Sequence, residues 1–125
     1  MQGVARQFFI LGIIMAIAGM MLGLKMAMTN DHVQMPVHAH IMVAAWLMSA
    51  VFGFFYHLFP VARQNKLAPI HFWIHTVSIV VLVVSLYFVL AGNPGVEPVT
   101  AISSILFFAG MVLFAWIAIP VINKA

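Results

Sequence analysis

The sequence predicts an all-α integral membrane protein, built as a bundle of four transmembrane helices. Of its 125 residues, 66% are hydrophobic and 6% are charged, whereas a soluble domain typically carries about 25% charged residues. A transmembrane helix needs roughly 20 apolar residues, and four such stretches occur at about residues 8–28, 38–59, 70–91 and 99–119. The four stretches use most of the chain, so we expect a single domain over residues 1–125.

Each stretch carries its own local signal. In the first, small residues recur three or four positions apart, a spacing that lets a neighbouring helix approach closely: Gly12, Ala16, Gly19 and Gly23. This stretch is too long for the apolar part of a signal peptide and has no clear cleavage site, so we expect it to be retained. Pro36 and Pro60 bound the second stretch. The turn sequence at residues 92–95 ends the third, and Pro120 lies near the end of the fourth.

The charged residues predict the orientation in the membrane. Four crossings place most of the basic residues on one side: Arg6, Arg63, Lys66 and Lys124. Asp31 and Glu97 fall on the other side, and Lys25 is the exception, a side chain able to extend to the interface. By the positive-inside rule both termini are cytoplasmic, and we expect a multi-pass protein of the bacterial inner membrane.

Composition excludes several classes of function. The chain has no cysteine, which excludes disulfides, iron–sulfur clusters and thiolate metal sites. It has two carboxylates and five scattered basic residues, so neither paired-carboxylate catalysis nor a nucleic-acid surface is expected. The sequence contains no phosphate-binding loop and no nucleophile motif. We therefore expect none of these catalytic arrangements.

His38 and His40 are the first candidates for chemistry, because they lie at the start of a membrane span. Ionisable side chains there usually have a partner or a function, and histidine is the commonest metal ligand. At about 100° per residue the two side chains point roughly 200° apart, so they cannot hold one metal together. A row of mostly small residues follows His38 along the helix: Ala45, Ser49, Gly53 and Tyr56. A bulkier row follows His40: Ala44, Leu47, Val51, Phe54 and Leu58.

The small-residue row has two readings from the residues alone. It suits a flat macrocycle lying against the helix, and it equally suits close helix packing. The two histidines likewise either ligate a metal or form hydrogen bonds with headgroups and water.

A second group of histidines is expected at the inner side of the membrane. His71 and His75 are four residues apart on one helix face, and His57 ends the preceding stretch at a similar depth. Three imidazoles suffice for copper or zinc. The interpretation we favour here is an interfacial belt in which His57 and His71 lie beside Trp73, because no carboxylate lies nearby in sequence to orient the rings.

The segment HAHIMVAAWLMSAVFGFFYHLFP resembles the tenth transmembrane helix of the catalytic subunit (subunit I) of haem–copper oxidases. That helix carries a His-x-His, a Phe-Gly or Gly-Gly step further along and a proline near its far end, which here are His38 and His40, residues 52–53 and Pro60. The segment KLAPIHFWIHTVS is similar to the start of the family's eleventh helix, and TAISSILFFAGMVLFAW to the start of its twelfth. The chain thus resembles a haem–copper-oxidase-like four-helix quarter of that subunit.

The resemblance implies that His38 and His40 are axial ligands of haem b. The chain departs from the family by lacking the copper-site histidines, the cross-linked tyrosine and the helix that supplies the second ligand of the low-spin haem. Because the family subunit arranges four-helix arcs with pseudo-threefold symmetry, we expect a homo-oligomer, a trimer, in which neighbours supply what is missing.

Three functions therefore remain open. The first is haem-based electron transfer, with a redox partner, or binding of a small gas such as nitric oxide or dioxygen. The second is a non-haem copper or zinc protein that uses the inner histidines. The third is an accessory or assembly subunit of a respiratory complex without a cofactor.

Overall fold

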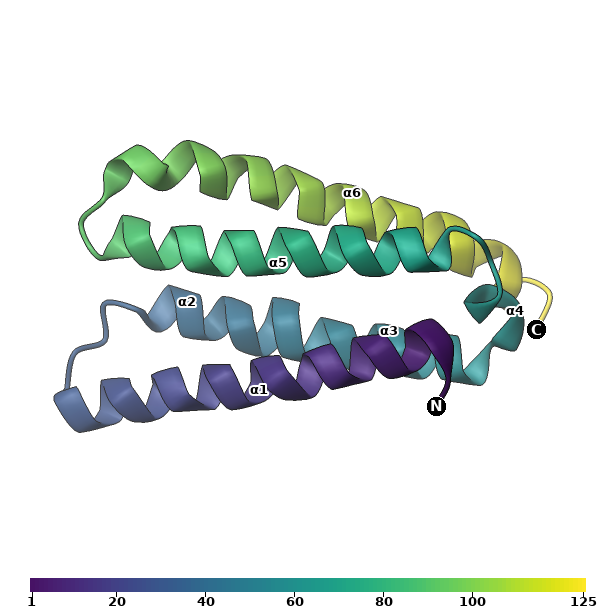
Figure 1. The fold of residues 1–125 in the computed structure, drawn as a ribbon, viewed down its shortest axis with the longest axis horizontal. Coiled ribbons are helices and arrows are strands. Elements are labelled where there is room, and N and C mark those ends of the chain that lie inside the picture. The colour runs from purple at the N-terminus through teal and green to yellow at the C-terminus, as the bar shows by residue number, and fades with distance from the viewer.

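The computed structural model describes residues 1–125 and consists of helices joined by short turns (Figure 1). The first span is α1 (Gly3–Thr29), and the second is a continuous rod of α2 (Met35–His40), η1 (Ile41–Leu47) and α3 (Met48–Leu58). A short helix, α4 (Pro60–Arg63), leads to the third span, α5 (Ala68–Leu90), and a turn, η2 (Pro94–Val96), leads to the fourth, α6 (Glu97–Ile122). All four spans are long and apolar enough to cross a membrane, which confirms the prediction of an all-α chain with four candidate transmembrane helices.

Most helices extend a few residues beyond the boundaries expected from hydropathy. α1 begins at Gly3 because Val4 and Ala5 are buried in the core. The second, third and fourth spans each have a proline in the first turn, where the missing N–H leaves no helical hydrogen bond unmade. Pro36 and Pro98 therefore lie inside helices that hydropathy alone begins later. α6 also continues through Pro120 to Ile122.

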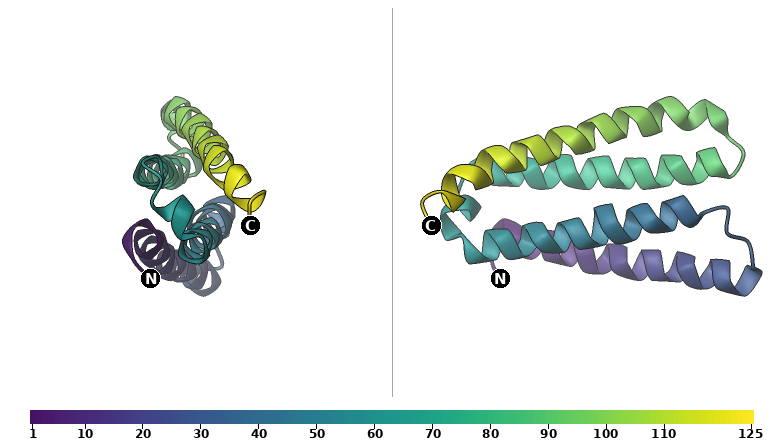
Figure 2. Two further views of the ribbon diagram at one scale, coloured as in Figure 1. Left: turned by 90° about the vertical axis from the view of Figure 1, so that its right-hand side faces the viewer. Right: turned by 180° about the vertical axis from the view of Figure 1, so that it is seen from behind.

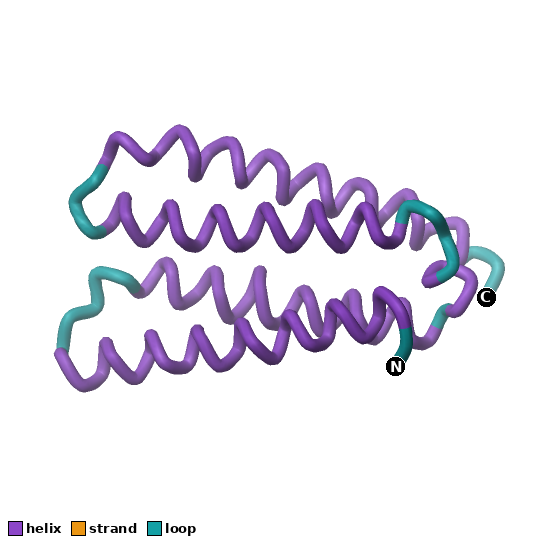
Figure 3. Tube along the Cα trace, viewed as in Figure 1, coloured by secondary structure: helices purple, strands orange, loops and turns teal.

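The spans form two antiparallel hairpins that lie side by side (Figures 1 and 2). α1 packs along the second span, and α5 packs along α6. Both termini and α4 lie at one end of the molecule, and the connections after α1 and after α5 lie at the other end (Figure 3). We call these the terminal end and the hairpin end.

The larger cluster of buried side chains lies in the half of the bundle near the terminal end. The main core cluster draws on α1, α3, α4, α5 and α6: Val4, Ala5, Phe8, Phe52, Tyr56, Ala62, Ala68, Phe72 and Ile117. A smaller cluster of Val37, Ile41, Ala45 and Ile79 joins the second span to α5 nearer the hairpin end. The terminal half therefore joins all four spans around aromatic side chains.

The small residues of α1 and α3 make their close contacts within the chain. A Cβ atom at Gly12 would lie 3.0 Å from the Trp46 ring, and one at Gly19 would lie 2.6 Å from Met42 Sδ. At Gly53 the nearest atoms belong to the α1 backbone. These positions let α1 approach the second span closely, so the helix that approaches these glycines belongs to the same chain.

We expect Gly53→Val to destabilise the first hairpin by about 1–3 kcal/mol, the usual effect of overpacking. A Cβ atom at Gly53 meets Ala5 O at 3.1 Å and Phe9 N at 3.2 Å, and backbone atoms cannot rotate away. The measurement is the midpoint of unfolding in mixed micelles of increasing SDS fraction, followed by tryptophan fluorescence. Gly95→Val is the matched control, because no atom lies within 4 Å of a Cβ there. Equal midpoints for the two variants would contradict the expectation.

Candidate functional site

His38 lies between α2 and α1, and its ring orientation is fixed. Its Nδ1 lies 2.8 Å from the carbonyl oxygen of Gly19. A carbonyl can only accept, so Nδ1 carries the proton and donates it. The ring also lies against Gly23, where a Cβ atom would come within 2.9 Å of Cε1. Two glycines of α1 thus form the surface on which this imidazole rests.

His40 faces the other way and is exposed. Its Nδ1 donates to the carbonyl oxygen of Pro36 at 2.7 Å, one turn earlier on the same helix. The expectation that His38 and His40 point to different sides therefore agrees with the structure. In both rings Nδ1 donates its proton to a carbonyl, and Nε2 has no protein partner. A metal-ligating histidine usually has this arrangement, with the far nitrogen hydrogen-bonded to a carbonyl or carboxylate.

A π-helical segment, η1, begins directly after His40 and covers seven residues. π-helical turns are rare and occur frequently at functional sites. The segment contains neither proline nor glycine, so the sequence offered no signal for it.

The two rows that follow the histidines have separate environments. Ala45, Ser49, Gly53 and Tyr56 are all buried, and Ser49 and Tyr56 form hydrogen bonds with α5. Of the two uses left open for this row, helix packing is therefore the one observed. The row after His40 is open to the surroundings, and its members Leu47, Val51, Phe54 and Leu58 are exposed. The row after His40 therefore faces out of the bundle.

The inner histidines separate into one exposed and two buried side chains. His57 is exposed on α3, whereas His71 and His75 on α5 are 0% and 2% exposed. The expectation that His71 belongs to an interfacial belt was therefore wrong. Its Nδ1 pairs with the Tyr56 hydroxyl at 3.0 Å, and His75 Nε2 pairs with the Ser49 hydroxyl at 2.9 Å. Hydroxyl groups of the second span thus orient these rings, instead of the carboxylates sought in the sequence.

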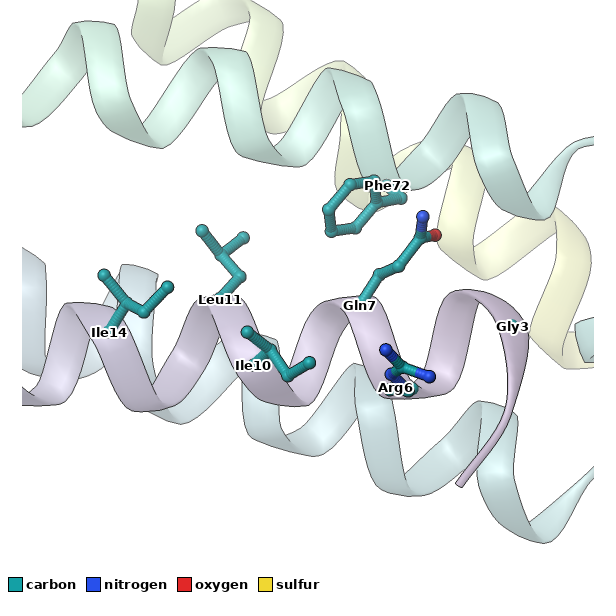
Figure 4. A pocket seen from close by; sticks show the side chains of 7 residues that line it. All are labelled: Gly3, Arg6, Gln7, Ile10, Leu11, Ile14 and Phe72. Carbon is teal, nitrogen blue, oxygen red and sulfur yellow. The ribbon is translucent and has the colours of Figure 1, made fainter.

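The three inner imidazoles do not form one metal site. No group of three His, Cys, Asp or Glu side chains in the structure is placed to hold a metal ion. His32, the remaining histidine, is exposed in the connection after α1. A groove of about 490 Å³ on α1 is lined by Arg6, Gln7, apolar side chains and Phe72, and contains no histidine (Figure 4).

Comparisons with protein-family models, with curated proteins and with solved structures found no match to this chain. Two arrangements stand out: His38 and His40, each with a free Nε2 atom, and the buried pair His71 and His75, with hydroxyl partners.

Proposed function

We propose that the protein binds haem b through Nε2 of His38 and Nε2 of His40, and acts in electron transfer or in binding nitric oxide or dioxygen. The observation that carries the proposal is the hydrogen bond from each Nδ1 to a backbone carbonyl, at Gly19 and at Pro36. These bonds fix the ring orientation and leave Nε2 without a protein partner, and a neutral imidazole with its proton on Nδ1 binds iron through Nε2. The rare π-helical segment beside them favours a functional site over two incidental interfacial histidines.

Haem, when bound, supplies one-electron redox chemistry or a position for a gas ligand. The chain's own residues hold and shield it. The Gly19 and Pro36 carbonyls orient the two imidazoles. The exposed row Leu47, Val51 and Phe54 offers an apolar surface beside His40 that keeps water away. An electron-transfer role further requires a redox partner, which would approach the side on which the haem lies.

We also propose that the haem lies at the contact between copies of the chain, in a trimer. His38 and His40 face different directions, and the only other histidine near the hairpin end is His32 in a connection. A second axial ligand is therefore more readily supplied by a neighbouring copy. Because the glycines of α1 are used within the chain, the contact would use the exposed apolar row beside His40 in place of the small-residue rows.

The proposed location is the bacterial inner membrane, with the terminal end in the cytoplasm. Arg6, Arg63 and Lys66 lie at that end with both termini, and Asp31 lies at the hairpin end. We expect Gln64→Cys to be labelled by an impermeant thiol reagent only after the cells are opened, and Gly95→Cys to be labelled in intact cells. The chain has no cysteine of its own. The reverse pattern would refute this orientation.

The visible absorption spectrum of the detergent-purified protein tests the proposed cofactor. A Soret band from bound haem b supports the proposal. Copper or zinc without a Soret band would favour the second function, a non-haem metal protein. A protein with neither, purified from haem-replete cells, would leave the accessory or assembly role and overturn the haem proposal.

A further inference from the structure

The buried pair His71 and His75 on α5 contains a polar atom without a partner, which the proposed haem site does not involve. Nε2 of His71 is fully enclosed and has no hydrogen-bond partner, and the only other buried side-chain atom in this condition is Gln34 Oε1. A buried polar atom without a partner is unfavourable. In native proteins such an atom calls for an explanation, which can be an ion or a water.

The two rings lie next to each other on successive turns of α5. Their centroids are 6.2 Å apart. Tyr56 engages Nδ1 of His71 and Ser49 engages Nε2 of His75, which leaves one nitrogen of each ring free. A metal–imidazole bond is about 2 Å long. An ion bound to both rings therefore requires ring centroids about 6 Å apart, and the observed centroid distance agrees with this. We propose that His71 and His75 together bind a single Cu(I) ion.

Coordination number selects Cu(I) over other metals. Zn²⁺ takes four ligands, and Cu²⁺ prefers a tetragonal set of nitrogen and oxygen ligands. No third His, Cys, Asp or Glu side chain joins this pair. Cu(I) is satisfied by two neutral imidazoles in a linear arrangement. Its single charge also costs less to bury than that of a divalent ion.

The surroundings suit a buried monovalent cation. Phe8 and Phe52 each approach both imidazoles, at 5.0 and 5.6 Å for Phe8 and at 4.6 and 5.1 Å for Phe52, between centroids. Phe114 stacks on His71 at 5.3 Å, and Phe107 lies 5.7 Å from His75. Aromatic faces attract cations where water is excluded. With the ion on Nε2, the proton of His71 is on Nδ1 and is donated to the Tyr56 oxygen, the usual support of a ligating imidazole.

Copper loading of the whole purified protein tests the site. Cu(I) is added under ascorbate in the presence of bicinchoninate as competitor, and bound copper is measured by mass spectrometry after desalting. We expect one copper per wild-type chain, and none in the His71→Gln, His75→Gln double variant. His57→Gln is the matched control and should retain the copper, because His57 is exposed and outside the pair. Copper retained by the double variant would assign it to some of the ten methionines and overturn the proposal.

Two further measurements separate ligation from folding. Tyr56→Phe keeps the aromatic ring and removes only the hydroxyl that orients His71, so we expect a 10- to 100-fold weaker affinity, as for other such partners of metal ligands. An affinity unchanged in Tyr56→Phe would contradict the proposed role of this hydrogen bond and with it the site. X-ray absorption should show two nitrogen neighbours and no sulfur, and sulfur neighbours would refute the site. The copper site and the haem site are tested independently, because His38→Ala and His40→Ala should leave the copper in place.

Discussion

The double variant His38→Ala, His40→Ala is expected to purify without haem b, with complete loss of the Soret band. Each ring presents an Nε2 that no protein group occupies, and an axial ligand cannot be replaced by a methyl group. The measurement is haem per chain from the pyridine haemochrome spectrum. His57→Ala and His71→Ala are the controls, because neither residue lies near the outer pair, and both should keep the wild-type spectrum. A wild-type spectrum in the double variant would contradict the assignment of His38 and His40 as haem ligands.

The single variants should differ in their effect on the fold. His40 is exposed, and its only hydrogen bond is to its own helix, so His40→Ala should alter the spectrum and leave the unfolding midpoint unchanged. His38 joins α2 to α1 through Gly19. Its replacement should also lower the free energy of unfolding by about 1 kcal/mol, the usual net value of one hydrogen bond. Equal stability losses in both variants would show that the two histidines are not placed as described.

The architecture was predictable from the sequence because hydropathy directly reports what a membrane span needs. Four apolar stretches and the turns between them predict four helices, and the structure has them. The ends were less predictable. Hydropathy falls at Arg6, yet the backbone of α1 is already helical there. Hydropathy also falls at Gln34, but α2 begins directly after this residue, because a proline is compatible with the first turn of a helix.

The direction of the outer histidines was predictable because helical periodicity alone sets it. Their hydrogen-bond partners were not, since Gly19 is on another helix and becomes a neighbour only when the hairpin closes. The same limit applies to the small-residue rows. Residues such as Gly19 and Gly53 allow close approach of any helix, and the pattern does not say whether that helix belongs to the same chain or to another.

The burial of His71 illustrates what a local pattern leaves out. The polar residues His71, His75, Ser78 and Ser85 lie on one side of α5, and this side is buried. A pattern in which the polar side of a helix faces outward therefore gives the wrong direction here. A histidine in its first turn, beside Trp73, is typical of an interface. Its burial instead results from α1, α3 and α6 converging at the terminal end, where Phe8, Phe52 and Phe114 surround the ring. Contacts between residues so far apart in sequence are set by the whole fold.

Phe8 is the residue on which this convergence depends most. Its side chain is fully buried. Its ring lies 5.0–5.7 Å, between centroids, from five other rings on α3 and α5: Phe52, Tyr56, His71, Phe72 and His75. It therefore ties the first hairpin to the second, where few other contacts of α1 with α5 exist. Pairs of aromatic rings at such distances each add about 0.5–1.5 kcal/mol beyond burial.

Phe8→Ala is accordingly expected to destabilise the bundle by about 3–5 kcal/mol, the usual cost of emptying an aromatic site in a core. The cavity would border both buried imidazoles, so copper affinity should fall together with stability. Unfolding in mixed micelles of increasing SDS fraction measures the first effect, and competition with bicinchoninate measures the second. Phe108→Ala is the matched control, because that ring is 69% exposed on α6 and contributes little to packing inside the chain. Similar midpoints for the two variants would show that the hairpins are held together elsewhere, by contacts such as the hydrogen bonds of Tyr56 with His71 and of Ser49 with His75.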